Sequence, residues 1–389
     1  MNPLSEIIRR EAAQRGFLSF ARFMELALYC PVHGYYETKK DNLGRQGDFY
    51  TSVGVGELFG QLLAFQFAEW LEEIKTLNSD ESRAGPQPST LNLVEAGAHD
   101  GKLARDILTW LRLSRPKLFG QIEYWIIEPS PRRQEWQKKT LEQYSPHVRW
   151  FDSLRSISSP NRKLSGVIFS NELLDAMPVH RLGWDAQSKK WFEWGVAVDG
   201  EQFTWARISD TLAPQSGARG FDPSSIPARD LSELQLPSSL LAVLPDGYMI
   251  ETCPAAENWW CEAANILERG KLMTIDYGLA AAELFSPKRL RGTLRAYFRH
   301  HASDDLLANV GEQDLTAHVN FSAIQAAGES AGLRTEMFST QSQFLTRILE
   351  KKSKGDSCGE WNTNQTRQFQ TLTHPEHLGR AFRALVQSR

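Results

Sequence analysis

The sequence predicts an α/β protein in which a mostly parallel β-sheet is joined by an N-terminal helical region and an inserted β-rich segment. Short apolar runs that end in polar turns alternate with helical patterns between residues 91 and 278, which is typical of parallel strands connected by helices. Apolar residues recur at helical intervals over residues 4–29. Large apolar and polar residues alternate after residue 181, and this pattern indicates antiparallel ribbons.

The composition is that of a globular protein with balanced charge. The chain has 389 residues, with 44 Lys and Arg against 47 Asp and Glu, and a formal net charge of −3. Because this length exceeds one small core, we expect two domains or one domain with large insertions. The charge balance argues against a nucleic-acid partner bound through bulk charge. The sequence contains no apolar run close to the ~18–20 residues that span a bilayer.

The N-terminus and the cysteines indicate a cytoplasmic location. Glu6 and Glu11 stand among the N-terminal arginines, and the long apolar core of a signal peptide is missing. The four cysteines lie far apart without a paired pattern, which favours reduced thiols. Cys30 and His33 have the spacing of zinc ligands, but no second pair follows, so we expect no metal site.

These patterns divide the chain into three parts. Residues 1–80 are predicted to form the helical region, which includes a strong helix from Val55 to Ile74. Residues 90–180 and 246–389 are predicted to form the α/β domain, and residues 181–245 the β-rich insertion, which we expect to offer a surface to a substrate or partner. The insertion ends in the Pro-, Ser- and Gly-rich stretch APQSGARGFDPSSIPARD.

Within the α/β part, each expected element follows from its apolar pattern. The expected strands are LNLVEAG (91–97), IEYWIIE (122–128), VRWF (148–151), SGVIFSN (165–171), GYMIETCP (247–254) and KLMTIDYG (271–278). Helical patterns follow the first strand and occupy residues 131–144 and 257–270.

Four of these strands end in acidic or amide side chains. In an open parallel sheet, ligands bind beyond the carboxyl ends of the strands. The strand ends that would share this edge are Glu95-Ala96-Gly97, Glu128-Pro129-Ser130, Ser170-Asn171-Glu172 and Asp276-Tyr277-Gly278. We therefore expect the functional site there.

The turn in LVEAGAHDGKLARDIL (93–108) carries the most specific spacing. A dinucleotide fingerprint would place GxGxxG after the strand and an acid about 20 residues later, whereas here Glu95 precedes Gly97 and Gly101. This order resembles the cofactor loop of class I S-adenosylmethionine methyltransferases. Gly97 would let the chain approach the ligand, Gly101 would let the helix pack closely, and the helix N-terminus would face the methionine carboxylate. Taken alone, the loop also fits a plain strand-to-helix turn.

Eight motifs together resemble the MidA family of S-adenosylmethionine-dependent methyltransferases. They are GDFYTS (47–52), LVEAGAHDGKLARDIL (93–108), IIEPSPRRQEWQ (126–137), SNELLDAMPVHRL (170–182), TIDYG (274–278), GTLRAYFRHH (292–301), DLTAHVNF (314–321) and TLTHPEHLGRAFRAL (371–385). The family includes a mitochondrial complex I assembly methyltransferase that acts on a protein arginine. The resemblance implies a Rossmann-like class I methyltransferase fold, S-adenosylmethionine as cofactor, and a protein substrate such as a respiratory-complex subunit.

The resemblance also implies roles at the cofactor. Glu128 is placed to accept hydrogen bonds from both ribose hydroxyls. Asn171 would hold the cofactor's amino group or simply close the strand. Thr51 and Ser52 resemble the family's cofactor-side loop, or they cap the helix that follows.

Glu172 and Asp175 are the candidate catalytic residues. A carboxylate pair can hold an arginine guanidinium and accept its proton as the methyl group arrives. Asp175 could instead cap a helix or turn beneath it.

Two departures from the family pattern keep alternatives open. Ala98 and His99 stand where the family has Pro and Gly, and the TS motif continues as VGVG instead of PEIS. The imidazole would either intrude on the cofactor or contact it. A non-catalytic, cofactor-binding assembly factor is therefore the alternative to an arginine methyltransferase. An NAD(P)-dependent oxidoreductase is less favoured because GxGxxG is absent.

Overall fold

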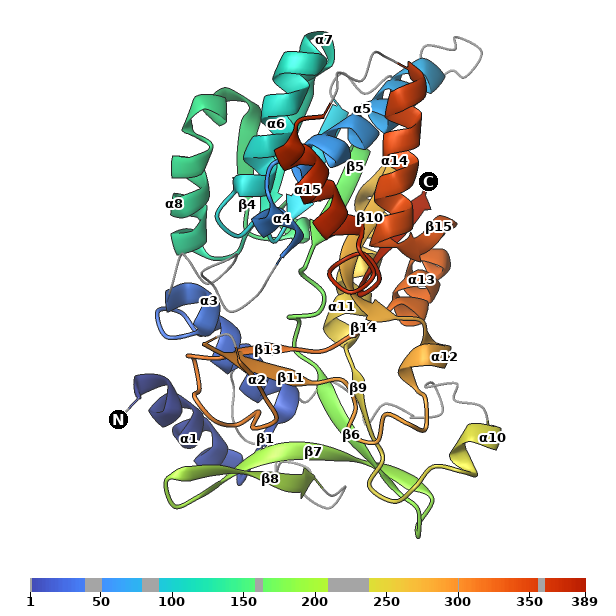
Figure 1. Ribbon diagram of the computed structural model, residues 1–389. Coiled ribbons are helices and arrows are strands. Elements are labelled where there is room, and N and C mark those ends of the chain that lie inside the picture. The colour runs from blue at the N-terminus through green and yellow to red at the C-terminus, as the bar shows by residue number, and fades with distance from the viewer. Residues whose placement is uncertain are drawn as a thin grey trace.

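The structure is a computed structural model that describes residues 2–38, 51–78, 91–157, 164–208, 238–299, 301–355 and 361–389. The GDFY part of one motif (47–50) and the Pro-, Ser- and Gly-rich stretch of the insertion lie outside these residues. A helix-covered sheet forms the upper part of the molecule in Figure 1, and the N-terminal helices with a second sheet form the lower part.

The main sheet has eight strands, in the order β15-β16-β10-β5-β2-β3-β4, with β14 paired to β10. Neighbours from β4 to β10 run parallel, and β16 is antiparallel to both β10 and β15. The predicted mostly parallel sheet is therefore confirmed. The strands are β2 (Leu91–Ala96), β3 (Ile122–Ile127), β4 (Val148–Phe151), β5 (Leu164–Asn171), β10 (Leu267–Leu279), β14 (Val319–Asn320), β15 (Arg334–Thr340) and β16 (Phe382–Ser388).

The register of this sheet aligns the strand ends. Ala96 lies beside both Ile127 and Ser170, and Ser170 lies beside Thr274. Strand order reverses at β2, because β3 and β4 extend the sheet on one side of it while β5 and β10 extend it on the other. Such a reversal opens a crevice beyond the carboxyl ends of the strands.

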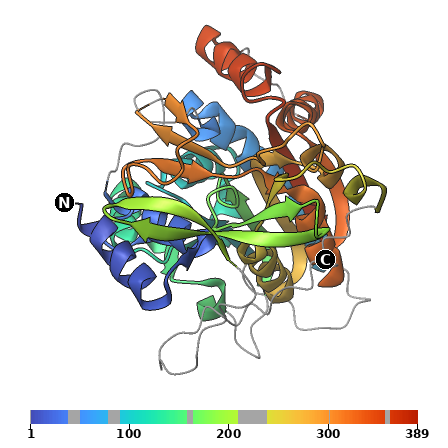
Figure 2. The same ribbon diagram turned by 90° about the horizontal axis from the view of Figure 1, so that it is seen from below.

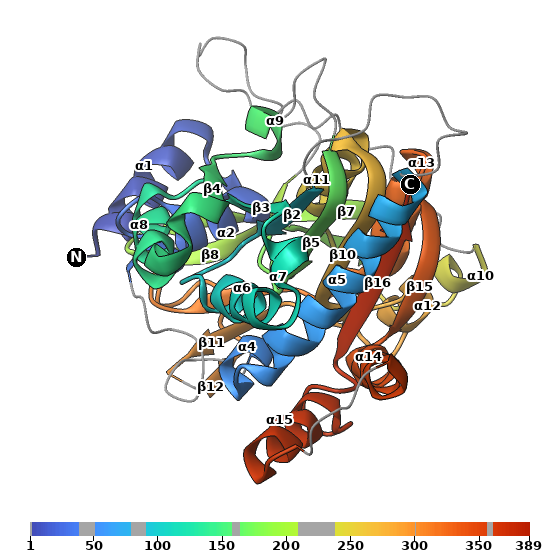
Figure 3. The same cartoon turned by 90° about the horizontal axis from the view of Figure 1, so that it is seen from above.

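Helices cover both faces because alternate strand residues point to opposite sides. Leu93 and Val167 pack with one helix layer, and Val94 and Ile168 pack with the other. Figure 3 shows α5 along the sheet between α6 and α14. The first layer contains α5 (Leu58–Asn78), α6 (Lys102–Ser114), α14 (Gln341–Gly355) and α15 (Thr363–Thr373), and the second contains α9 (Leu154–Ile157), α11 (Pro254–Ile266) and α13 (Phe321–Ser330).

The predicted ribbon of the insertion is confirmed as part of a second, five-stranded sheet. This sheet comprises β1 (Leu18–Ser19), β6 (His180–Asp185), β7 (Lys190–Asp199), β8 (Gln202–Ile208) and β9 (Met249–Thr252), and all its pairs are antiparallel. Helices α1 (Pro3–Arg15) and α2 (Phe20–Tyr29) share a core with it. Figure 2 shows the β7–β8 ribbon crossing the underside of the molecule.

Two elements pack outside the predicted part of the chain to which their residues were assigned. The strand expected over residues 247–254 forms β9, which pairs with β6 in the second sheet because its Ile250 packs with Leu182 and Trp184. Helix α5 lies within the first 80 residues but packs against the main sheet. It starts at Leu58 and not at Val55, because Gly56 (φ +149°) separates it from the short helix α4 (Ser52–Val55).

A three-stranded sheet and several short helices complete the described chain. They are β11 (Arg295–Phe298), β12 (His301–Ser303), β13 (Asp314–Thr316), α3 (Tyr35–Thr38), α7 (Pro116–Phe119), α8 (Pro131–Thr140), the 3-10 helix Glu142–His147, α10 (Ser238–Leu241) and α12 (Ala281–Leu284). Among the helices described, none is both long enough and apolar enough to cross a membrane.

Candidate functional site

The carboxyl ends of β2, β3 and β5 open into a cavity of about 600 Å³. It lies where the strand order of the main sheet reverses. The sequence-predicted residues that line it are Thr51, Glu95, Gly97, Glu128, Asn171, Glu172 and Asp175. Ser52 and Gly101 lie behind this wall: Ser52 is fully buried and Gly101 precedes helix α6.

The turn after β2 requires left-handed backbone at both predicted glycines. Gly97 has φ +75° and Gly101 has φ +81°, a conformation that glycine adopts without steric cost. A Cβ atom on Gly97 would lie 2.9 Å from Cδ1 of Leu173. The Glu95 carboxyl is 2 % exposed and accepts a hydrogen bond from the Tyr124 hydroxyl at 2.7 Å. Burial raises the pKa of Glu95 to about 7 despite that hydrogen bond.

His99 also takes the left-handed conformation, with φ +45°. Its Nε2 is buried and has no hydrogen-bond partner in the described chain, while Nδ1 lies 3.9 Å from Oδ1 of Asp100. Asp100 accepts from the Lys102 backbone N–H at 3.1 Å and pairs with the Lys102 ammonium at 2.8 Å. Burial would raise the pKa of Asp100, but His99 and Lys102 outweigh it and lower that pKa. Asp100 thus caps the start of α6, because Gly101 has no side chain to do so.

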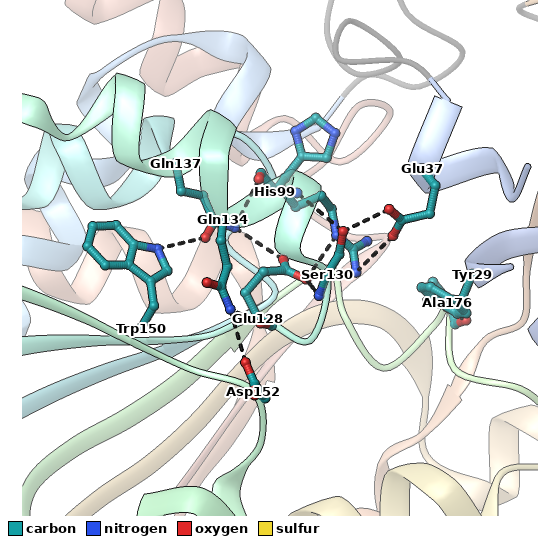
Figure 4. Close-up of polar contacts among 11 residues, drawn as sticks. Tyr29, Glu37, His99, Glu128, Ser130, Gln134, Gln137, Trp150, Asp152 and Ala176 are labelled. Carbon is teal, nitrogen blue, oxygen red and sulfur yellow. Dashed lines mark hydrogen bonds and ion pairs between the residues drawn. The ribbon is translucent and has the colours of Figure 1, made fainter. Parts of the chain in front are cut away.

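Glu128 lines the cavity and is 1 % exposed, and Figure 4 shows its polar contacts. Its Oε1 accepts from the Ser130 backbone N–H at 3.0 Å and from Nε of Arg133 at 2.9 Å, and its Oε2 accepts from Nε2 of Gln137 at 3.1 Å. Burial raises the pKa of Glu128, and the Arg133 charge partly offsets this. The carboxylate is therefore held in one orientation.

Glu37, from α3, completes this network. Its Oε2 accepts from the Ser130 hydroxyl at 2.7 Å, and its Oε1 lies 3.8 Å from Nη2 of Arg133. Sequence reasoning missed Glu37, Arg133 and Gln137. The helix-start pattern SPRRQEWQ could have indicated Arg133, but nothing in the sequence links Glu37 to Ser130, 93 residues away.

Glu172 closes the site on the β5 side in a left-handed backbone conformation, φ +52°. Its Oε1 accepts from the Ser52 backbone N–H at 3.1 Å and from Nδ2 of Asn171 at 2.9 Å. Burial raises the pKa of Glu172 to about 7. The Oδ1 atom of Asn171 is buried and lacks a partner among the described residues. Glu172 therefore ties the Thr51–Ser52 segment to the sheet edge.

Asp175 lines the cavity and shares a side-chain hydrogen bond with the neighbouring carboxyl of Asp276. Burial, together with the charges of Asp276, Glu172 and Asp314, raises its pKa well above the usual range. It caps no helix, since residues 172–179 form turns and bends. Asp276 braces the turn instead, because it accepts from the backbone N–H groups of Leu173 and Leu174 at 3.1 and 2.8 Å.

The far end of the cavity comes from the N-terminal helices and from β13. Tyr29 and Tyr36 stack with their ring centroids 5.5 Å apart. The Tyr36 hydroxyl lies 3.0 Å from both carboxylate oxygens of Asp314, and the Tyr29 hydroxyl donates to the Ala176 carbonyl at 2.9 Å. Sequence reasoning missed this aromatic and acidic end, because it joins three distant segments.

The residues present fit S-adenosylmethionine. The cavity volume falls within the ~300–1,000 Å³ of small-molecule sites. The unpartnered Oδ1 of Asn171 offers an acceptor for an ammonium group, and a side chain at Gly97 would press on Leu173. Within the described part of the chain, no cluster of three or more His, Cys, Asp or Glu side chains could hold a metal ion.

Comparisons with known proteins agree with this geometry. A family model described as "Putative S-adenosyl-L-methionine-dependent methyltransferase" matches residues 62–339. The mitochondrial protein arginine methyltransferase NDUFAF7 homolog of Drosophila melanogaster is 29% identical over 350 residues, covering 85% of this chain and 70% of its own length. Human NDUFAF7 is 26% identical over 411 residues, covering 98% of this chain and 83% of its own. A COG1565 superfamily protein from Burkholderia thailandensis, solved with S-adenosyl-homocysteine bound, is 31% identical with a TM-score of 0.77, covering 99% of this chain and 92% of its own.

The cytoplasmic location expected from the sequence is wrong. The fly and human relatives are both named as mitochondrial proteins. Cysteines without a paired pattern fit more than one compartment, so that pattern did not justify the expectation.

Proposed function

We propose that this chain, which belongs to the S-adenosyl-L-methionine-dependent methyltransferase family, methylates an arginine of a partner protein. The observation that carries this proposal is one cavity lined by both the cofactor-type turn at Gly97 and the carboxyls of Glu172 and Asp175. The fly and human relatives, named as protein arginine methyltransferases, support it.

The proposed cofactor contacts come from three strand ends. Glu128 would accept from the ribose hydroxyls, Asn171 would take the amino group through its unpartnered Oδ1, and Gly97 would let the backbone approach the ligand. Glu95 and Thr51 line the same wall. Ser52 and Gly101 would act from behind it, through the hydrogen bond to Glu172 and through the start of α6.

Methyl transfer to arginine needs a carboxylate near the acceptor nitrogen. When bound, S-adenosylmethionine supplies an electrophilic methyl group on a positively charged sulfur. A guanidinium is protonated in water because its pKa exceeds about 12. The acceptor nitrogen would therefore have to give up a proton as the new N–C bond forms and the methyl–sulfur bond breaks, with S-adenosylhomocysteine as the leaving group. Glu172, with a pKa near 7, would take that proton and pass it to solvent. Asp175 would orient the guanidinium, whose positive charge lowers the pKa of both carboxyls.

Neither alternative function has a specific observation in its favour. A non-catalytic assembly factor would not require buried carboxyls in the cofactor cavity. A nicotinamide-dependent oxidoreductase would be expected to carry the GxGxxG turn, which this chain lacks.

The division of the chain into residues 1–80, the split methyltransferase domain (90–180 and 246–389) and the insertion (181–245) stays a proposal. Tyr29 and Tyr36 line the cavity. We therefore propose that the protein substrate approaches from the side of the N-terminal helices and the second sheet.

A labelled-methyl experiment tests the function. The full chain would be incubated with methyl-labelled S-adenosylmethionine and an extract of cells that lack this protein, and the labelled proteins would be hydrolysed. Label recovered as methylarginine, and abolished by excess S-adenosylhomocysteine, is the expected result. Label on another amino acid, or none despite cofactor binding, would overturn the arginine proposal.

A further inference from the structure

We propose that Glu37 is a positioning residue for the cofactor, acting through Arg133 to keep Oε2 of Glu128 open to the ribose hydroxyls. The inference rests on the proposed role of Glu128 in binding that ribose. Glu37 lies outside the segment that the family model matches, residues 62–339. Through Glu37, the N-terminal helices would contribute to cofactor binding.

The first observation is that the two carboxylate oxygens of Glu128 have different numbers of polar contacts. Within the described chain, Oε1 takes the Ser130 N–H at 3.0 Å and both Nε and Nη2 of Arg133, at 2.9 and 2.8 Å. Among the same described residues, Oε2 takes only Nε2 of Gln137, at 3.1 Å. Because a carboxylate has about four lone-pair positions, two per oxygen, the remaining capacity is on Oε2.

The second observation is that Arg133 does not use its usual pairing. A guanidinium and a carboxylate commonly form two parallel hydrogen bonds, one to each oxygen. Here both Arg133 nitrogens approach the same oxygen of Glu128, while Nη2 also lies 3.8 Å from Oε1 of Glu37. The Arg133 guanidinium also lies 5.9 Å from the centroid of the Tyr29 ring. The guanidinium is thus shared between two carboxylates, and the Glu37 side of the network restrains it.

The third observation is that Glu37 is itself fixed and buried. It is 7 % exposed, and its Oε2 accepts from the Ser130 hydroxyl at 2.7 Å. That hydroxyl also accepts the Arg133 backbone N–H at 3.2 Å, where Ser130 caps helix α8. Figure 4 shows Glu37 and Glu128 on opposite sides of Ser130. Without the Glu37 charge, Arg133 would be free to form the two-oxygen pair with Glu128 and to occupy Oε2.

The experiment combines a protein change with a ligand change. Glu37→Gln removes the charge but keeps an oxygen that can accept from Ser130. Calorimetry would measure the binding of S-adenosylhomocysteine and of its 2′,3′-dideoxyribose analogue to the full chain. Glu135→Gln, at an exposed position of helix α8, which also carries Arg133, is the matched control. Glu128→Ala is expected to show the affinity that remains without ribose recognition.

The wild-type chain is expected to prefer S-adenosylhomocysteine over the dideoxy analogue by about 10- to 100-fold, as for hydrogen bonds to a charged group. Glu37→Gln is expected to weaken S-adenosylhomocysteine binding about 5- to 20-fold. The affinity for the analogue is expected to stay within about twofold of the wild-type value, because occupation of Oε2 of Glu128 by Arg133 affects only recognition of the hydroxyls. Glu135→Gln is expected to match the wild type with both ligands.

Three results would overturn the inference. Unchanged binding of S-adenosylhomocysteine by folded Glu37→Gln would show that Glu37 does not act on Glu128. An equal loss for both ligands would show a merely structural role. If the wild-type chain binds both ligands equally, the ribose role of Glu128 itself is refuted. This result is distinguishable from the first two because it concerns the wild-type chain and not the variant. Should Glu37→Gln fail to fold, Ser130→Ala removes one contact of Glu37 and is expected to show the same selectivity for the ribose, and a non-selective loss there would overturn the inference.

Discussion

Glu172 combines a strained backbone with a perturbed carboxyl. Its φ of +52° is uncommon for a residue other than glycine, and such strain concentrates at functional sites. Its backbone N–H donates to the Ile275 carbonyl at 2.9 Å, and its side chain holds Ser52. The neighbouring strand thus fixes the carboxyl in the cavity.

Replacing Glu172 with Gln should lower turnover far more than cofactor affinity. The amide retains an oxygen for Ser52 but cannot take the proton that the acceptor nitrogen releases. Loss of one acid–base group typically costs about 10²–10⁴ in rate. Single-turnover methyl transfer, beside calorimetric binding of S-adenosylhomocysteine, measures both quantities. Full activity in the variant would mean that another group takes the proton.

Glu95 should make stability depend on pH. Burial raises its folded-state pKa to about 7, whereas an unfolded glutamate titrates near 4.3. Between these values the folded state binds more protons than the unfolded state, so this group's contribution to stability falls as pH rises through that window. Glu95→Gln keeps an acceptor for Tyr124 and removes the charge.

Glu95→Gln should therefore raise the free energy of unfolding by about 1–3 kcal/mol at pH 8 and have little effect near pH 4.5. Urea unfolding of the ligand-free chain at the two pH values measures this difference, with Glu135→Gln as the exposed control. An equal effect at both pH values would show that Glu95 does not titrate in this window.

The sequence predicted the strand-end residues well and their partners poorly. Glu95, Glu128 and Glu172 follow apolar runs, and parallel strands bring such ends to one edge. Glu37 reaches the same cavity through tertiary packing, which no local pattern encodes, whereas only the helix-start pattern around Arg133 could have indicated that residue. Asp175 was expected as a possible brace, but Asp276 accepts the backbone N–H groups of that turn.

Among the elements, the parallel strands were predictable and the partner of β9 was not. The strands β2, β3, β5 and β10 are apolar on both faces because helices cover both, and this produces the apolar runs of the sequence. The pattern of β9 indicates a strand but contains no information on its neighbour.

The β2–α6 connection allows a matched test of a tight turn. Gly97 (φ +75°) and Gly200 (φ +59°) both adopt left-handed backbone. A Cβ at Gly97 would lie 2.9 Å from Leu173, whereas one at Gly200 would meet nothing within 4 Å. Alanine at either position should cost about 1–2 kcal/mol of unfolding free energy through its backbone conformation.

Only Gly97→Ala should also weaken cofactor binding, because its methyl group presses on the cavity wall at Leu173. Urea unfolding and calorimetry with S-adenosylhomocysteine separate the two effects. Equal loss of affinity in both alanine variants would show that backbone strain alone, and not the cavity turn, sets cofactor affinity.

At the scale of the whole molecule, the cavity is where the main sheet, the N-terminal helices and the three-stranded sheet meet. The main sheet supplies Glu128 and Glu172, helices α2 and α3 supply Tyr29 and Glu37, and β13 supplies Asp314. β1 joins the N-terminal region to the insertion through β7, with Leu18 opposite Val196. The sequence indicated the separate parts, but their meeting depends on contacts between residues far apart in the chain.

Cofactor binding should therefore protect the N-terminal helices as well as the main sheet. A ligand that contacts the folded state alone stabilises every segment whose opening would expose the site. Hydrogen exchange with and without saturating S-adenosylhomocysteine should show slower exchange in α2, α3 and β13, beside the expected slowing in the β2–α6 turn. Helix α15 is the internal control, because it contributes no residue to the cavity lining. Protection limited to residues 91–134 would mean that the main sheet binds the cofactor by itself, and the N-terminal wall would then serve the protein substrate alone.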